Sequence, residues 1–127
     1  MNKIRVLFLD VKNAKEPQII EVCNDNNDDF HRLIGCDVID VTQRTLGGKK
    51  YCIVADDVGA LKYNRKLSVW SFNSYERING NVIIANFDGV EDLSSLEDVD
   101  IVRLLMCQAR YVTDKPYTVL KTDQITS

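Results

Sequence analysis

Chemistry-bearing side chains are densest between Asp56 and Arg65, directly after an apolar strand pattern. The segment joins two adjacent carboxylates to Tyr63 and to an Asn64-Arg65 pair. The Arg65 guanidinium could grip a carboxylate or phosphate through two hydrogen bonds, and loops at strand ends often carry binding residues. We therefore predict Asp57, Tyr63, Asn64 and Arg65 as binding residues. The competing interpretation is structural, with Asp57 and Asn64 bonding their own loop backbone and Arg65 pairing with an aspartate.

Trp70 is the fifth candidate binding residue. It stands with Phe72 and Tyr75 in the least regular part of the chain, residues 57–80, where a fully solvated loop would leave too many large apolar groups in water. Two interpretations stay open. Trp70 packs in the core, or it forms an exposed patch with Phe72 that binds another protein.

Catalytic and metal-binding patterns do not emerge. His31 is the only histidine, so no Ser/His/Asp or Cys/His set can be assembled around it, and we read it as a surface residue. A calcium loop counted from Asp25 fails, because its sixth position is Phe30 and its twelfth is Cys36. Residues 47–50 (Gly-Gly-Lys-Lys) lack the rest of a phosphate loop and predict a hairpin turn. We therefore predict no catalytic residues, no metal and no cofactor.

One acidic stretch runs from Asp88 to Asp100 with six carboxylates and no lysine or arginine. Negative charge at the start of a helix is favourable, which is the simpler interpretation. The sharper one is an acidic patch that imitates the phosphates of DNA or binds a basic partner.

Composition places the chain among ordinary globular domains. It has 127 residues, 45% of them hydrophobic and 28% charged, and a formal net charge of −3. One domain of this size can bury a proper core, and a net negative charge argues against nucleic acid as the main partner. The four cysteines (Cys23, Cys36, Cys52 and Cys107) match no zinc spacing, so we expect reduced thiols. With no signal peptide or membrane-span pattern, we expect a soluble cytoplasmic protein.

The elements that must position these residues begin with two predicted hairpins. Ile4–Leu9 and Gln18–Cys23 have strand patterns separated by a polar loop, and the second pair spans Asp37–Asp56 with a turn at Gly47-Gly48. A short helix is predicted to begin at Asp28 or Asp29 and end at Gly35. Asn81–Phe87 and Tyr117–Lys121 complete the expected strands.

The segment Leu93–Arg110 gives the strongest helix pattern. Ser94 with Glu97, or Ser95 with Asp98, fits a capping box. An apolar stripe repeats at helical spacing and needs a sheet face to bury against: Leu96, Val99, Val102, Leu105, Met106 and Ala109. We predict one α+β domain over residues 1–127, a mostly antiparallel sheet of five or six strands with one long C-terminal helix packed on it and one short helix.

The loop also carries a resemblance. The sequence resembles a domain-of-unknown-function family of phages, plasmids and integrative elements, chiefly of Firmicutes. The motifs that carry the resemblance are Asp56-Asp57, Gly59-x-Leu61-Lys62, Asn64-Arg65, and a glycine followed by an apolar strand, Gly80 to Phe87. The match covers about residues 4 to 107 and includes Leu93-Ser-Ser-Leu96 with Asp100-Ile101. The chain departs from the family at Ser68–Asn79 and at Tyr63, where the family usually has proline nearby. The resemblance implies a mobile-element setting, no assigned activity, and Asn64 and Arg65 as shared positions.

Three functional hypotheses follow. The first is a non-enzymatic binding or regulatory protein of a mobile element, acting on a host or phage protein. The second is a small-molecule or nucleotide-binding enzyme built on the loop 56–65. The third is an acidic, DNA-mimicking antirestriction protein. An exposed patch at Trp70 and Phe72 favours the first hypothesis, and a pocket lined by Asp57 and Arg65 favours the second. Acidic side chains along one face, at roughly the spacing of DNA phosphates, favour the third. Oligomeric state stays open.

Overall fold

A computed structural model gives the structure of the chain and describes residues 3–56, 66–88 and 92–123. Within these ranges the chain folds as two β-sheets with two short α-helices, α1 (Asp28–Ile34) and α2 (Asp98–Leu105). No helix in the described ranges is both long enough and apolar enough to cross a lipid bilayer. The predicted α+β class is confirmed.

The first sheet is antiparallel and has six strands, in the order β2-β1-β7-β4-β3 with β8 paired to β7. Its strands are β1 (Lys3–Leu9), β2 (Gln18–Cys23), β3 (Ile39–Leu46), β4 (Lys49–Asp56), β7 (Val82–Asp88) and β8 (Asp92–Ser94). Both predicted hairpins are present, because alternating apolar residues set the register of each strand. β1 and β2 pair from Lys3–Cys23 to Phe8–Gln18.

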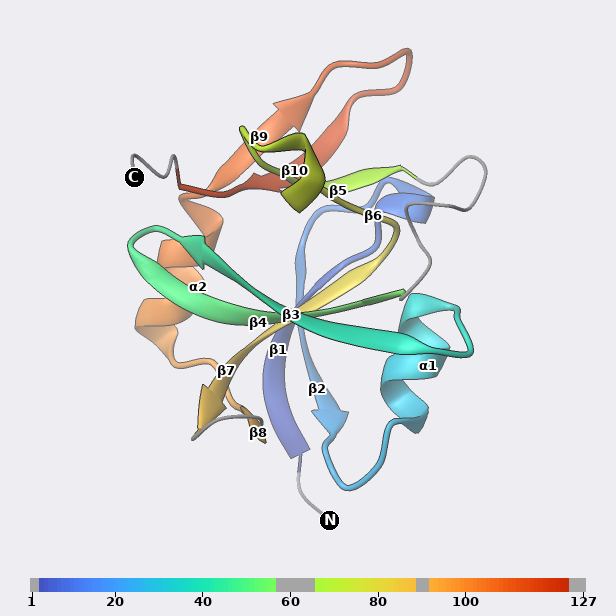
Figure 1. Cartoon of the computed structure of the whole chain (residues 1–127), viewed down its shortest axis with the longest axis vertical. Helices are drawn as coiled ribbons and strands as arrows, with labels where there is room; N and C mark the ends of the chain where they lie inside the picture. The colour runs from blue at the N-terminus through green and yellow to red at the C-terminus, as the bar shows by residue number, and fades with distance from the viewer. Residues whose placement is uncertain (1–2, 57–65, 89–91, 124–127) are drawn as a thin grey trace.

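A second sheet of four strands lies above the first in Figure 1 and was not predicted. Its order is β6-β5-β10-β9, with β5 (Leu67–Trp70), β6 (Ile78–Asn79), β9 (Gln108–Tyr111) and β10 (Tyr117–Lys121). β5 and β10 are parallel, with Leu120 opposite Val69, whereas the other pairs are antiparallel. The irregular region after residue 65 therefore contributes two strands, and only part of it packs as a loop.

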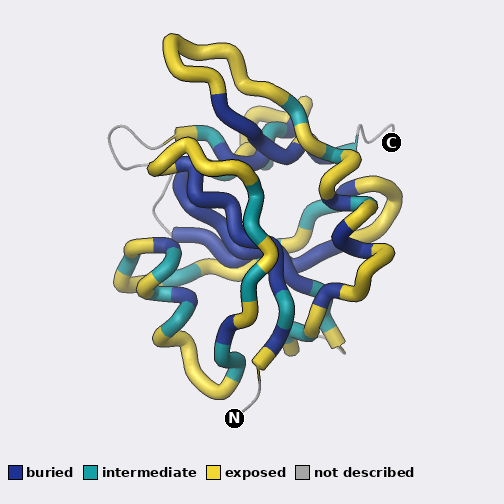
Figure 2. Tube along the Cα trace, turned by 180° about the vertical axis from the view of Figure 1, so that it is seen from behind, coloured by how far each residue is buried: buried dark blue, intermediate teal, exposed yellow. Residues whose placement is uncertain are grey.

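Two apolar clusters cover the two faces of the first sheet. On one face, Phe30 and Ile34 of α1 pack against Val6, Val54 and Ile83. On the other, residues of the first sheet meet α2 and the second sheet, and the most buried members are Leu7, Tyr51, Ile53, Val69, Ile84, Leu104 and Leu120. Figure 2 shows the buried segments running through the middle of the molecule. Strands buried on both faces explain why β1, β4 and β7 read as nearly continuous apolar runs.

The long C-terminal helix is a wrong prediction. α2 covers only Asp98–Leu105. Its N-cap is Glu97, whose backbone N–H donates to the Asp100 carboxylate, so neither predicted capping box forms. Of the predicted apolar stripe, Val99, Val102, Leu105 and Met106 are exposed. The helix instead buries Asp100, Ile101 and Leu104, because the buried carboxylate of Asp100 finds its hydrogen-bond donors on the sheet beneath.

The Gly47-Gly48 turn of the second hairpin is confirmed, with φ angles of +65° and +87°. The Asp123 carboxylate accepts both turn amides, from Gly47 N at 2.8 Å and Gly48 N at 2.7 Å. A Cβ at position 47 would lie 2.5 Å from Cγ of Arg103, whereas a Cβ at position 48 would meet nothing within 4 Å. The turn thus closes against both α2 and the end of β10.

This difference predicts unequal effects of two neighbouring substitutions. Gly48→Ala should cost about 1 kcal/mol, the penalty of a left-handed conformation with a side chain. Gly47→Ala carries the same penalty and also displaces Arg103, so it should cost roughly 2–3 kcal/mol. Urea unfolding of the two variants measures this. Equal losses would show that Arg103 yields freely to the added methyl group.

Candidate functional site

Trp70 is the one predicted binding residue that falls within the described residues; Asp57, Tyr63, Asn64 and Arg65 lie outside them. It ends β5, where its carbonyl oxygen accepts a hydrogen bond from Thr122 N at 2.9 Å. Its side chain is half-buried, because β5 lies inside the second sheet between β6 and β10. Trp70 is therefore neither a core residue nor a free surface residue.

Two cations and one aromatic ring surround the Trp70 side chain. The guanidinium carbon of Arg77 lies 5.1 Å from the ring centroid and Nζ of Lys121 lies 5.3 Å from it. Phe72 meets the indole edge-on, with centroids 4.6 Å apart, and Lys121 also lies 5.2 Å from the Phe72 ring. Cation–π and edge-to-face contacts of this kind fix the rings while leaving the positive charges at the surface.

The segment after Trp70 is held in one shape by its own hydrogen bonds. Ser71 is buried; its hydroxyl accepts from Asn73 N and its carbonyl accepts from Nε of Arg77 at 2.8 Å. The Asn73 side chain caps the 3-10 helix Ser74–Glu76 by accepting from Tyr75 N. These bonds present Phe72, 53% exposed, and Tyr75, 95% exposed, on a rigid loop.

A hollow of about 690 Å³ lies beside this loop. It is lined by polar, aromatic and basic side chains with no aspartate or glutamate: Lys66, Leu67, Trp70, Ser74, Tyr75, Arg77, Asn79, Tyr111, Thr113 and Tyr117. The Tyr117 hydroxyl donates to the Leu67 carbonyl at 2.8 Å, and burial raises the pKa of Tyr117 to about 12. The Tyr117 hydroxyl thus ties β10 to the start of β5.

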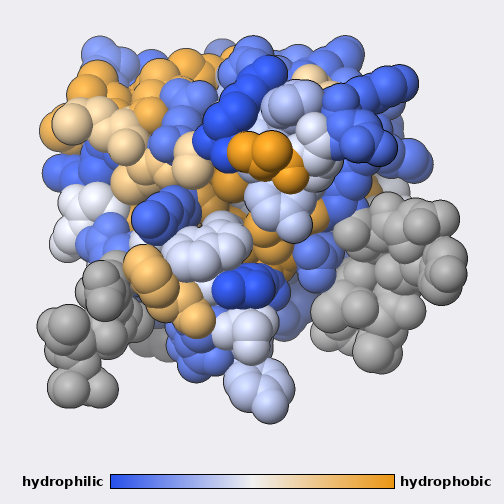
Figure 3. Space-filling view, turned by 90° about the horizontal axis from the view of Figure 1, so that it is seen from above, coloured by the Kyte–Doolittle hydropathy of each residue, from blue (hydrophilic) through white to orange (hydrophobic). Residues whose placement is uncertain are grey.

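The segments that form the second sheet carry a net positive charge, although the net charge of the whole chain is negative. Residues 66–80 and 108–121 carry five lysines and arginines against two acidic residues. One of the five, Arg110, pairs with Glu16 at 3.1 Å. Figure 3 views this end of the molecule, where hydrophilic side chains predominate and apolar side chains are exposed among them. We call the surface formed by Lys66, Trp70, Phe72, Tyr75, Arg77 and Lys121 the Trp70 surface.

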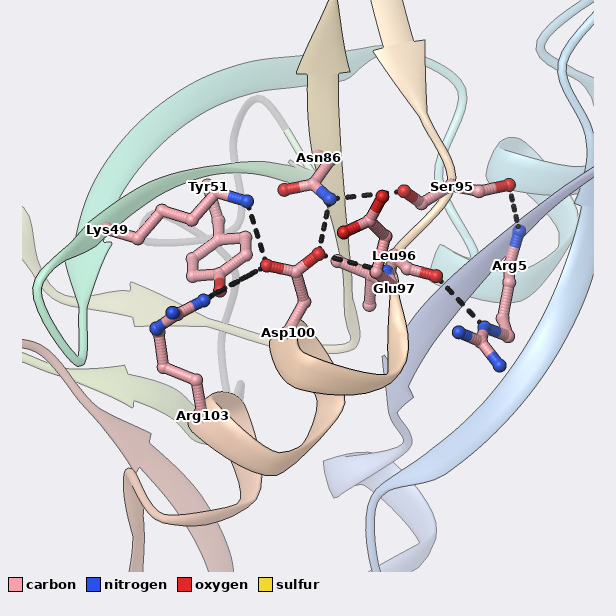
Figure 4. A network of polar contacts seen from close by, with 9 residues as sticks. All are labelled: Arg5, Lys49, Tyr51, Asn86, Ser95, Leu96, Glu97, Asp100 and Arg103. Atoms are coloured by element: carbon pink, nitrogen blue, oxygen red, sulfur yellow. Dashed lines mark hydrogen bonds and ion pairs between the residues drawn. The ribbon is translucent and has the colours of Figure 1, made fainter.

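A second cluster of charged groups is buried between α2 and the first sheet (Figure 4). Asp100 is fully buried and accepts hydrogen bonds from Nζ of Lys49 at 2.8 Å, the Tyr51 hydroxyl at 2.9 Å and Nδ2 of Asn86 at 2.6 Å. Nη1 of Arg103 contacts both the Tyr51 hydroxyl and Asp100, at 2.9 and 3.1 Å. Every carboxylate oxygen thus has several donors.

The electrostatics of this cluster follow from its donors. Burial works to raise the pKa of Asp100, but hydrogen bonds from Lys49, Glu97 N, Asn86 and Tyr51 outweigh it and hold that pKa well below its ordinary value. Burial raises the pKa of Tyr51. Because Asp100 and Tyr51 are both buried, neither can touch a substrate. The cluster fixes α2 on the sheet.

Two carboxylates of the acidic stretch have basic partners within the fold. Asp98 pairs with Arg5 at 2.9 Å, and Asp100 is buried in the cluster. Asp98 and Asp100 lie in the first turn of α2, as the simpler interpretation expects, whereas Asp88 and Asp92 are exposed on β7 and β8.

The other chemistry-bearing residues have structural contacts. Nδ1 of His31, on α1, lies 3.0 Å from the Cys36 carbonyl oxygen, at the end of that helix. Among the described residues no three His, Cys, Asp or Glu side chains are grouped to hold a metal ion. The described cysteines are free thiols.

Sequence reasoning missed the cations of the Trp70 surface and the role of Asp100. Arg77 and Lys121 lie 7 and 51 positions after Trp70, and only the β5–β10 pairing brings Lys121 to the ring. No local pattern signals that pairing. An Asp in the middle of an apolar helix pattern was a usable signal for a buried carboxylate.

Searches against family models, curated proteins and solved structures match nothing to this chain.

The Asp100 cluster predicts a specific pH dependence. Because the folded state lowers the pKa of this carboxyl, its stabilisation is fully present above the unfolded pKa of about 4. It decreases progressively as the pH falls from there through the lower pKa of the folded state. Asp100→Asn removes the charge and should cost roughly 2–4 kcal/mol at pH 7. The cost should shrink at pH 3, as shown by urea unfolding at both values. A cost that is the same at both would mean that Asp100 stabilises by shape alone.

Proposed function

We propose that this chain is a non-enzymatic binding protein that holds an acidic segment of a partner protein on the Trp70 surface. The observation that carries the proposal is the half-buried Trp70 indole, flanked by Arg77 and Lys121 and continued by exposed Phe72 and Tyr75. Tryptophan, tyrosine and arginine are the residues that dominate the energetics of protein interfaces. The adjoining hollow offers room for an anchoring side chain.

The charge of the surface supports an acidic partner. The hollow is lined by Lys66 and Arg77 and by no carboxylate. Opposite charge across an interface speeds association and disfavours wrong partners. The hydrogen bonds within residues 71–77 support the same proposal, because a loop already held in one shape loses little entropy on binding.

The partner we propose is a host or phage protein, in the mobile-element setting that the resemblance implies. The enzyme hypothesis rests on Asp57, Asn64 and Arg65, which lie outside the described residues. The DNA-mimic hypothesis loses the Asp100 carboxylate, which is buried, whereas Asp88, Asp92, Glu97 and Asp98 are exposed.

A capture experiment that compares three forms of the chain tests the proposal. The wild type, a Phe72→Ser/Tyr75→Ala variant and a Val38→Ser/Val41→Ser control are used to capture proteins from host lysate. All four positions are exposed, so folding should be preserved and is checked by circular dichroism. A protein retained by the wild type and by the control should bind the Phe72/Tyr75 variant with an affinity at least about tenfold lower. A loss of this size corresponds to removing a small hot spot from the interface.

The same partner should bind more weakly as salt is raised, because screening weakens attraction between exposed charges. The Lys66→Glu variant should lower the association rate with the partner, measured by surface plasmon resonance. Equal capture by all three forms, or no partner for the wild type, would refute the proposed function.

A further inference from the structure

Two cations, each seated over an aromatic ring, line the hollow beside the 71–77 loop. Nζ of Lys66 lies 5.4 Å from the centroid of the Tyr117 ring, and the guanidinium carbon of Arg77 lies 5.1 Å from the centroid of the Trp70 ring. All four of these residues are among those that line the hollow. The hollow therefore offers a ligand two separate positive charges.

The second sheet sets the distance between the two cation–ring pairs. Trp70 ends β5 and carries Arg77 over its ring, whereas Lys66 directly precedes β5. Tyr117 lies at the Lys66 end as well, since its hydroxyl donates to the carbonyl of Leu67. The two pairs are thus four residues apart along the strand, which is about 13 Å at the usual rise of a β-strand.

Neither cation is neutralised within the part of the chain that the structure describes. Lys66 and Arg77 form no ion pair there. Nε of Arg77 donates to the Ser71 carbonyl at 2.8 Å, which leaves the two terminal nitrogens of the guanidinium available to an acidic group. Glu76 and Asp114, the acidic residues of the second-sheet segments, do not line the hollow. Two unpaired cations favour a ligand with two negative groups.

The dimensions of the hollow favour an extended ligand. A volume of about 690 Å³ spread over about 13 Å leaves a width of about 7 Å, which is less than the roughly 10–12 Å diameter of an α-helix. A strand is narrow enough to enter, and two of its residues four positions apart match the distance between the cations. Side chains at the first, third and fifth positions of a strand point to the same side. The middle one therefore points into the hollow, which Tyr75 and Tyr111 also line.

We propose that the segment held by the Trp70 surface is an extended strand with two carboxylates four residues apart and an apolar side chain midway between them. One carboxylate pairs with Lys66 and the other with Arg77, and the apolar side chain enters the hollow among the aromatic rings. This inference rests on the proposed function and specifies the conformation, the charge spacing and the anchoring residue of the acidic segment.

Three seven-residue peptides of identical composition test the spacing. Each contains two glutamates, one phenylalanine and four serines, and the glutamates are two, four or six residues apart, with the phenylalanine midway in the second and third peptides. NMR titration of the isotope-labelled chain measures each Kd. The peptide with glutamates four residues apart should bind at least about threefold more tightly than the other two, because only it engages both cations, and an exposed ion pair contributes about this much. Equal affinities, or no binding of any peptide, would overturn the inference.

Substitutions of single cations locate the effect. Lys66→Gln should abolish the preference for the four-residue spacing, and Lys66→Arg should restore it. Lys115→Gln is the matched control, since it removes one positive charge from the same sheet at an exposed position that does not line the hollow. A preference that survives Lys66→Gln, or one that is lost in Lys115→Gln, would contradict the placement of the ligand. If the capture experiment identifies a partner but the peptides show no preference for spacing, this inference fails while the proposed function stands.

Discussion

The burial of one carboxylate, that of Asp100, determines how the C-terminal half of this molecule is arranged. A buried charge is tolerated only with near-complete pairing, and here the donors come from β4, β7 and α2 itself. Lys49 and Tyr51 tie the helix to one strand and Asn86 ties it to the next. The position and the rotation of α2 are thereby both specified. Everything that follows α2 in the chain, including β9 and β10, starts from that fixed point.

The same carboxylate explains which parts of the fold could be predicted. The hairpins β1–β2 and β3–β4 and the strand β7 follow from local alternation and from the Gly47-Gly48 turn, whose information lies within a few residues. For α2, the apolar periodicity of the sequence treats Asp100 as a polar residue and predicts that it faces solvent. Its partners Lys49 and Tyr51 are 51 and 49 positions away, so no window of sequence around the helix contains the reason for its true orientation.

The second sheet was missed for a related reason. β5 and β6 are short, and the central pairing of β5 with β10 is parallel and joins residues about 50 positions apart. Short strands in parallel pairing carry neither a turn signal nor a long alternating pattern. Trp70 could be chosen as a site residue from its type alone. The cations that flank its ring, Arg77 and Lys121, depend on the sheet that local sequence patterns did not reveal.

The second sheet and α2 give this small chain two distinct exposed faces, joined by β10. The Thr122 amide bonds Trp70 on one side, and the Lys121 amide bonds the end of the α2 segment at Cys107 on the other. Lys121 belongs to both neighbourhoods, because its amide bonds Cys107 while its Nζ lies 5.3 Å from the Trp70 ring and 5.2 Å from the Phe72 ring. The rotation of α2 set by Asp100 and the placement of a cation beside Trp70 are therefore linked through the end of β10.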